Sequence, residues 1–224
     1  MTTASDPPFP SDRDVPTDDL PAILADLWER LRDGAERSAP AFHLPTLSTI
    51  RTAAAGDSGA GRLEPAARTV VLRYADREEN GGTIACHTDA RGAKIAEIEA
   101  YPRVAWTFYD PRARLQVRAN GAATVLTEGA IVDAAWEATA PSARRCYLAP
   151  HVPGTPSDEP EVNMPPAVRK RDPTPEESAP GRANFAVLRT AIDGFDWLHL
   201  HHAGHRRALF NREEGEWRGG WVAV

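Results

Sequence analysis

The sequence predicts a mainly β fold with flanking helices, whose strands close wholly or partly into a barrel. Short segments rich in β-branched and aromatic residues outnumber the segments with helical spacing. Gly, Pro, Asn and Asp separate these segments at short intervals, as they do between the strands of all-β domains. Many short strands with few helices favour a barrel.

The N-terminal part is expected to hold a disordered lead, one helix and one strand. Residues 1–17 are rich in Pro, Asp and Ser, a composition typical of disorder. Apolar residues then recur at helical spacing over 20–34, after two aspartates that can cap a helix. Residues 42–51 are expected to form the first strand, followed by a Gly/Ala/Ser loop at 53–61.

In the middle of the chain, the β-branched segment 69–74 is expected to form a central strand. An Asn-Gly-Gly turn then leads into a strand at 83–87. The further expected elements are a helix at 90–100, a hairpin of strands 104–109 and 115–126 with Asp110-Pro111 in its turn, and a helix at 131–140.

The C-terminal part begins with a segment at about 149–183 that holds many of the 20 prolines and is expected to be a long loop. Four short strands are expected after it, at 185–191, 196–202, 206–211 and 216–222. Residues 18–224 are thus expected to form a single domain.

Composition excludes several classes of protein. The net charge of −6 argues against a nucleic-acid binder, which would normally show a basic face. The two cysteines exclude a disulfide-rich secreted scaffold, and the first thirty residues lack a signal-peptide pattern. No apolar run approaches the ~20 residues that a membrane helix needs. The sequence therefore predicts a cytoplasmic protein without a membrane partner.

Cations and small polar groups gather around the second and third expected strands. Arg68 and Arg73 flank the apolar run 69–72. The run HTDARGAK (87–94) then places a hydroxyl, a capping acid and two cations at the start of a helix. Uncapped N–H groups and the dipole at such a start favour a phosphate. The alternative is that these arginines are simply solvated strand ends.

Two other features leave alternatives open. Gln116 either points inward, where its amide would need hydrogen-bond partners, or lies on the surface. Four histidines, at 199, 201, 202 and 205, lie close together, but no cysteine or clear carboxylate ligand stands near them in sequence. We expect a polar strand face there and no metal site.

Several of these motifs together resemble the flavin-binding half of the pyridoxamine 5′-phosphate oxidase family. RTVVLR (68–73) resembles the family's strand with a leading arginine and a closing basic residue that face the cofactor. HT (87–88) stands where the family has an aromatic residue and threonine, and Lys94 matches the last residue of its serine-arginine-lysine group. RLQVRANG matches its arginine-glutamine-valine strand, and Trp197 and Arg207 keep the spacing of two residues that close over the flavin from a partner subunit.

The resemblance implies an FMN-binding split β-barrel that forms a homodimer with two FMN sites at its interface. It also implies the following cofactor contacts, in which Arg91 replaces a missing arginine: Arg68, Arg73, His87, Thr88, Arg91, Lys94, Gln116, Trp197 and Arg207.

The substrate half departs from the family's pattern. Trp136 and Thr139 stand where an aromatic residue and an arginine would bind a phosphorylated substrate. Ala203 replaces a further arginine, whereas His205 is retained. We therefore expect a different small-molecule substrate, uncharged or smaller, with Arg73 and His205 as candidate contacts. Each lost charge-assisted bond is worth about 1.5–3 kcal/mol.

The function expected from this resemblance is an FMN-dependent oxidoreductase that transfers hydride to or from a small molecule. Two alternatives remain at the level of sequence. The first is a flavin carrier or sensor without turnover, which would share every cofactor residue. The second is a haem-binding split barrel, which the histidine cluster would favour.

Overall fold

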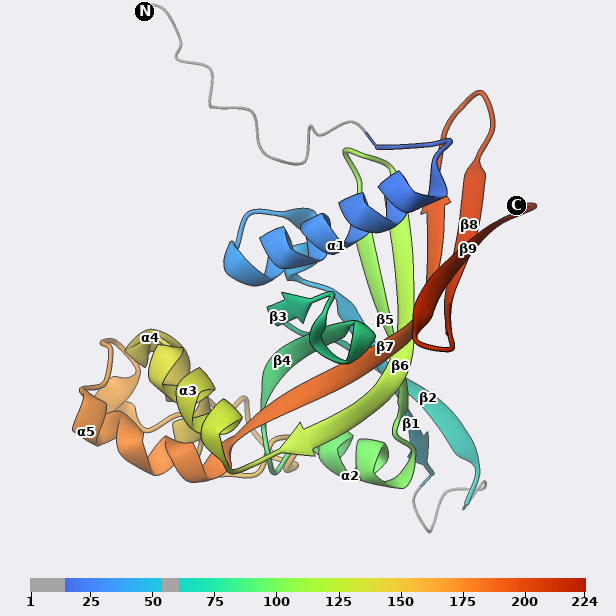
Figure 1. Ribbon diagram of the computed structural model, residues 1–224. Coiled ribbons are helices and arrows are strands. Elements are labelled where there is room, and N and C mark those ends of the chain that lie inside the picture. The colour runs from blue at the N-terminus through green and yellow to red at the C-terminus, as the bar shows by residue number, and fades with distance from the viewer. Residues whose placement is uncertain (1–14, 54–60) are drawn as a thin grey trace, which may run out of the picture.

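A computed structural model describes residues 15–53 and 61–224, and these form a mainly β fold with flanking helices (Figure 1). Most of the expected disordered lead and of the loop at 53–61 lies outside the described residues. The strands are β1 Thr46–Thr52, β2 Leu63–Thr69, β3 Leu72–Asp76, β4 Thr83–Asp89, β5 Arg103–Asp110, β6 Leu115–Leu126, β7 Phe185–His199, β8 Arg206–Glu213 and β9 Glu216–Val222. The helices are α1 Leu20–Glu36, α2 Ala93–Ala100, α3 Ala130–Ala138, α4 Pro141–Arg144 and α5 Pro175–Ser178.

All nine strands belong to one antiparallel sheet with the order β2-β1-β5-β6-β7-β4-β3, to which β8 and β9 are added beside β7. Strands β2 and β3 follow each other in the chain but lie at opposite ends of this order. Only two residues, Val70 and Val71, join them, so the two ends of the sheet must meet. The sheet therefore closes into a split β-barrel, as the sequence predicts.

This closure corrects the expected central strand at 69–74. The chain leaves β2 after Thr69 and re-enters the sheet at Leu72, so the apolar run supplies a crossing between two edge strands. At the crossing, the backbone N–H of Val70 donates to the carbonyl oxygen of Pro45 at 3.0 Å. The β-branched residues of this crossing are only partly buried, and their composition does not distinguish a crossing from a strand.

The two strands expected at 185–191 and 196–202 are one strand of 15 residues, β7. It pairs with β6 along one edge, and with β4 and then β8 along the other. The registers Gly121↔Ile192 and Asn120↔Gly194 leave Asp193 as an extra residue, which makes a bulge. Gly194 therefore lies within a bent strand, where the sequence suggested a break.

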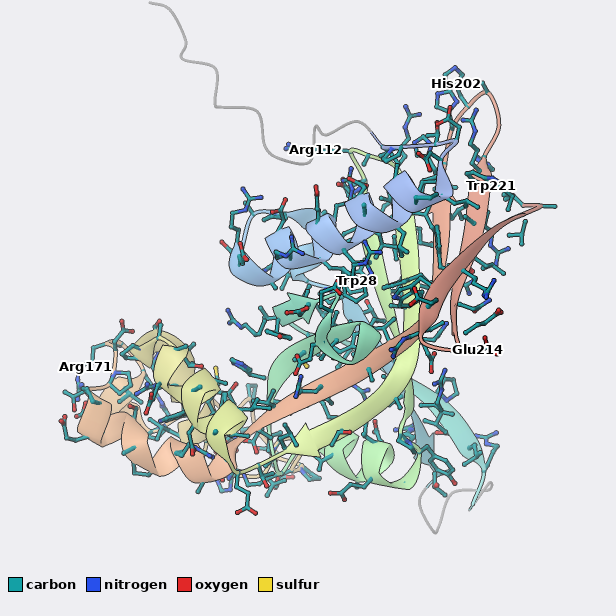
Figure 2. The ribbon with its side chains drawn as sticks, viewed as in Figure 1. Trp28, Arg112, Arg171, His202, Glu214 and Trp221 are labelled. Carbon is teal, nitrogen blue, oxygen red and sulfur yellow. The ribbon has the colours of Figure 1, made fainter. Side chains whose placement is uncertain are left out.

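The expected helix at 20–34 is confirmed as α1, which ends two residues later at Glu36. The Oδ1 atom of Asp19 caps it by accepting from the N–H of Ala22. Its apolar stripe packs on the barrel, and Trp28 lies between helix and strands (Figure 2). Ile23, Leu27 and Leu31 are fully buried there, each contributing about 1.5–3 kcal/mol.

A second, smaller core lies where α3 packs on β7 (Figure 1). Phe185, Trp136 and Tyr147 meet edge to face in it, with ring centroids 4.9–6.0 Å apart. The following segment, 149–165, has no regular element and is succeeded by η5 Pro166–Val168, α5 and η6 Ala179–Asn184. Among the described residues, no helix is long and apolar enough to cross a membrane.

Candidate functional site

A cleft of about 760 Å³ separates α3 from the adjoining strands β3, β4 and β7. Five side chains from the strands and the turn before β4 make one side of it polar: Arg73, Tyr74, Glu79, His87 and Arg189. The opposite wall is apolar and consists mainly of alanines from α3 and the turn after it. A concave, largely apolar site with a few convergent polar groups is the usual form of a small-molecule pocket.

A β-bulge places two consecutive side chains in this cleft. The register of β3 on β4 passes from Leu72↔Cys86 to Tyr74↔Ala85, so Arg73 has no partner in the ladder. In a regular strand Arg73 and Tyr74 would point to opposite faces, whereas both line the cleft here. Bulges commonly re-aim side chains in this way beside functional sites.

Charge in the cleft is unevenly compensated. Arg189 forms an ion pair with Glu79 of the turn before β4. Arg73 forms no ion pair or hydrogen bond with any residue that the structure describes, and its side chain is exposed to the cleft. Burial, and then the neighbouring Arg73, lower the pKa of His87 to about 4, so its imidazole is neutral at pH 7. Burial and the nearby Glu79 raise the pKa of Tyr74 to about 12.

A second polar cluster lies at the other face of β4, where α2 begins. Lys94 donates from Nζ to the Oγ1 of Thr88 at 2.8 Å. Burial lowers the pKa of Lys94, and Arg68 lowers it further. Gly92 precedes the helix and offers no side-chain cap. A Cβ added there would stand 3.3 Å from Nζ of Lys94, so glycine leaves room for the ammonium over the first turn.

Arg68 joins this cluster from β2. Its guanidinium donates to the hydroxyl of Thr49 and, at 2.8 Å, to a carboxylate oxygen of Glu97 on α2. In the ladder Arg68 stands opposite Leu47, which is fully buried, so its side chain is directed into the end of the barrel. Arg68 of β2 and Thr88 of β4 thereby reach the same helix from two strands that are remote in the sheet.

This cluster has the donor set that a phosphate monoester requires. It combines a guanidinium, an ammonium, a hydroxyl and an uncapped helix start, contributed by Arg68, Lys94, Thr88 and α2. Helix N-termini and charge-assisted donors are the usual ligands of phosphate in proteins. The residues present therefore fit the phosphate of a nucleotide cofactor.

Arg91 lies outside that set. Its guanidinium donates to both carboxylate oxygens of Asp89, at 3.0 and 2.7 Å, and to the carbonyl oxygen of Ala149 at 3.0 Å. These bonds tie the start of the segment 149–165 to the end of β4. Arg91 and Lys94 thus have different partners, although only two residues lie between them in sequence.

Gln116 and Arg207 share the outer face of the sheet. Gln116 stands opposite Leu198, which stands opposite Arg207, so the three form one cross-strand row. The neighbours of Gln116 in β6, Leu115 and Val117, are fully buried, so its side chain points away from the core. Of the two orientations left open by the sequence, the outward one is correct.

Arg207 is held by a buried acid on this outer face. Its guanidinium donates to Asp196 at 2.9 and 2.7 Å, and Arg118 pairs with the same carboxylate. Burial alone would raise the pKa of Asp196, but the hydrogen bonds from Arg207 and Arg118 outweigh it and lower the pKa. The acid stays ionised and fixes both arginines.

The remaining predicted contacts lie elsewhere. Trp197 is fully buried in the main core, and its Nε1 has no hydrogen-bond partner among the described residues. His205 is exposed in the β7–β8 hairpin, whose tip carries His202 (Figure 2). Its Nδ1 accepts from the backbone of His201. No group of three His, Cys, Asp or Glu side chains in the described ranges could hold a metal ion.

Comparisons with known proteins point to a family of FMN-binding proteins. Residues 25–127 match the family model of the pyridoxamine 5′-phosphate oxidase FMN-binding domain. A solved pyridoxamine 5′-phosphate oxidase-related, FMN-binding protein from Nostoc punctiforme is 25% identical, with a TM-score of 0.65. The match covers 90% of this chain and 95% of that one. Over residues 25–127 the chain is similar to the FMN-binding domain of the pyridoxamine 5′-phosphate oxidase family.

A second structure, PhzG from Burkholderia lata in complex with tetrahydrophenazine-1-carboxylic acid, is similar in fold to this chain. It is 18% identical, with a TM-score of 0.58 and coverage of 98% of each chain. No curated protein matches the chain in sequence. The matched FMN-binding region includes the α2 cluster and ends just before α3, so it does not extend to the helical wall of the cleft.

Sequence reasoning missed Tyr74, Glu79 and Arg189 as cleft residues. Tyr74 follows Arg73 directly, and the alternation of a regular strand would direct it to the other face. Arg189 is recognisable only through the pairing of β7 with β4, which sets it opposite Ala85. No local signal in the sequence announces either the bulge or this register.

Proposed function

We propose that the chain binds FMN and is an FMN-dependent oxidoreductase acting on a small molecule. The observation that carries this proposal is the hydrogen bond from Lys94 to Thr88 at the uncapped start of α2. Together with Arg68, these residues would hold the cofactor's phosphate. FMN, when bound, supplies hydride transfer at its ring.

The chain's own residues would bind the cofactor's phosphate and contact the substrate. Lys94 and Arg68 balance the phosphate charge, and Glu97 keeps the guanidinium of Arg68 in place at 2.8 Å. In the cleft, Arg73 would face the substrate and neutral His87 would offer a donor or acceptor without adding charge. Arg91 has a different part in this proposal, which is to anchor the segment after Ala149.

The proposal includes a homodimer. Arg68 points into the end of the barrel, whereas Gln116 and Arg207 lie on the outer face. A single chain therefore does not surround one ligand with both sets, and a second copy would supply Gln116 and Arg207. Analytical ultracentrifugation tests this: a protein that stays monomeric at micromolar concentration contradicts it. A cytoplasmic location is also proposed, and cell fractionation tests it.

Titration of the apoprotein with FMN, followed by flavin fluorescence, tests the cofactor. Anaerobic addition of NADPH, followed by the flavin's visible band, then tests the chemistry. Bleaching of the band and its return with an electron acceptor would support an oxidoreductase. Stable binding of FMN that a chemical reductant bleaches but NADPH does not would favour a carrier or sensor. Because Trp197 is packed in the core, the proposal gives it no cofactor contact.

A further inference from the structure

We infer that the cleft beside α3 recognises a flat, mainly apolar molecule carrying a single carboxylate, which Arg73 binds. This inference rests on the proposed function only in treating the cleft as the substrate side of the site. It differs from the uncharged substrate expected from sequence, and the reason lies in how the cleft's charges are paired.

The cleft presents one uncompensated cation. Two arginines line it, but the carboxylate of Glu79 neutralises Arg189. Arg73 has no such partner among the described residues, and the bulge in β3 directs it into the cleft. The neighbouring imidazole of His87 is neutral at pH 7. One free guanidinium matches one carboxylate, which it can bind through two parallel hydrogen bonds.

The rest of the cleft is shaped for a flat apolar body. Its floor is the face of the sheet at Ala85 and Val187, which belong to neighbouring strands. Its opposite wall is the side of α3 at Ala134 and Ala138, one helical turn apart. Small side chains on both surfaces leave a slot between sheet and helix. A ring system would bury apolar area against both walls at once.

The position of the cation fixes the ligand's orientation. Arg73 and Tyr74 stand at the β3 edge of the slot, and the alanines of α3 lie across from it. A carboxylate at the β3 edge would leave the ring between the walls. A phosphate dianion would meet one unpaired cation here, Arg73, because Arg189 is paired with Glu79. The α2 cluster also has one unpaired cation, Lys94, beside the paired Arg68, but it adds the uncapped first turn of an eight-residue helix. The cleft therefore favours a monoanion over the phosphate ester expected of a true pyridoxamine phosphate oxidase.

The test uses 2-naphthoate and its neutral isostere 2-naphthamide, titrated into the apoprotein by isothermal calorimetry. We expect naphthoate to bind at least about tenfold more tightly, since a charge-assisted pair is lost with the amide. Inorganic phosphate should not displace naphthoate at equal concentration. Equal affinities for acid and amide, or displacement by phosphate, would overturn the inference on the unmodified protein.

Three variants locate the effect. Arg73→Gln should reduce naphthoate affinity to that of naphthamide, whereas Arg218→Gln, on the exposed strand β9, should leave it unchanged. Glu79→Gln frees Arg189 and should tighten naphthoate binding about two- to fivefold. Weaker binding in Glu79→Gln, with an unchanged circular dichroism melt, would show that the pair only shapes the cleft and would contradict the inference.

The same titrations with and without saturating FMN separate this inference from the proposed function. Naphthoate should bind in both cases. Naphthoate binding in a protein that ignores FMN would sink the cofactor proposal and retain the carboxylate cleft. FMN binding that expels naphthoate would show that the slot accepts the flavin itself, and the inference would fail.

Discussion

The ammonium of Lys94 lies 2.8 Å from the hydroxyl oxygen of Thr88, and this bond joins the first turn of α2 to the end of β4. Both groups are more than half buried, and no acid pairs with Lys94 in the described structure. A desolvated cation beside an uncapped helix start costs free energy unless an anion pairs with it. This relationship underlies the proposed phosphate site.

Replacing Lys94 with Met should weaken FMN binding about 10- to 100-fold, because one charge-assisted hydrogen bond to phosphate is lost. Fluorescence titration of the apoprotein measures the effect. The chain has one other lysine, Lys170, which is exposed, and Lys170→Met is the matched control. Equal affinities in the two variants would remove Lys94 from the site.

Arg91→Gln should behave differently from Lys94→Met. Its guanidinium is committed to Asp89 and to the carbonyl of Ala149, so its loss should lower the free energy of unfolding by about 1–3 kcal/mol. FMN affinity should change less than about threefold. Urea denaturation and FMN titration on one preparation give both values. A loss of affinity as large as that of Lys94→Met would restore Arg91 to the phosphate site.

Substitutions at two glycines, one at a close strand contact and one in open space, test the packing of β6 against β7. A Cβ at Gly121 would lie 2.2 Å from the carbonyl oxygen of Ala191, where β6 and β7 approach at the bulge. Gly121→Ala should therefore cost about 2–4 kcal/mol of unfolding free energy. A Cβ at Gly220 meets nothing within 4 Å, so Gly220→Ala should be neutral or slightly stabilising. Similar melting temperatures for the two variants would contradict the strand approach described here.

His87 should make the fold sensitive to acid. Its pKa falls from 6.5 to about 4 in the folded chain, because burial and Arg73 disfavour its charged form. Between these values the unfolded chain binds the extra proton, so stability is lost as the pH falls from about 6.5 to 4. At pH 4 the loss is about 3 kcal/mol.

In His87→Gln that part of the pH dependence should disappear, whereas in His202→Gln, at the exposed hairpin tip, it should persist. Chemical denaturation at pH 7 and at pH 4 measures the two free energies for each protein. If wild type and His87→Gln lose the same amount on acidification, the imidazole is not buried as a neutral group.

Sequence patterns predicted the elements whose signals are local. The apolar spacing of α1, the Asp110 turn between β5 and β6 and the helix α2 all lie within two or three residues of expectation. The wrong predictions concern segments whose structure depends on which strands pair with each other. Val70 and Val71 have strand composition, yet barrel closure makes them a crossing.

In the candidate site, too, contacts between residues close in sequence were predictable and contacts set by strand pairing were not. Thr88 and Lys94 are six residues apart across a strand end and a helix start, and their contact follows from that short path. The placing of Tyr74 depends on a bulge, and that of Arg189 depends on a register with a strand about 100 residues away. Trp197 has the family's spacing, but spacing does not show which face of a strand meets the core.

The visible absorption spectrum of the purified protein, recorded before and after addition of FMN and removal of the free cofactor, tests the central claim most directly. The structure leads us to expect a flavin spectrum retained at about one FMN per chain. A protein that stays colourless after exposure to FMN would contradict the phosphate site at Thr88 and Lys94, and with it the proposed function.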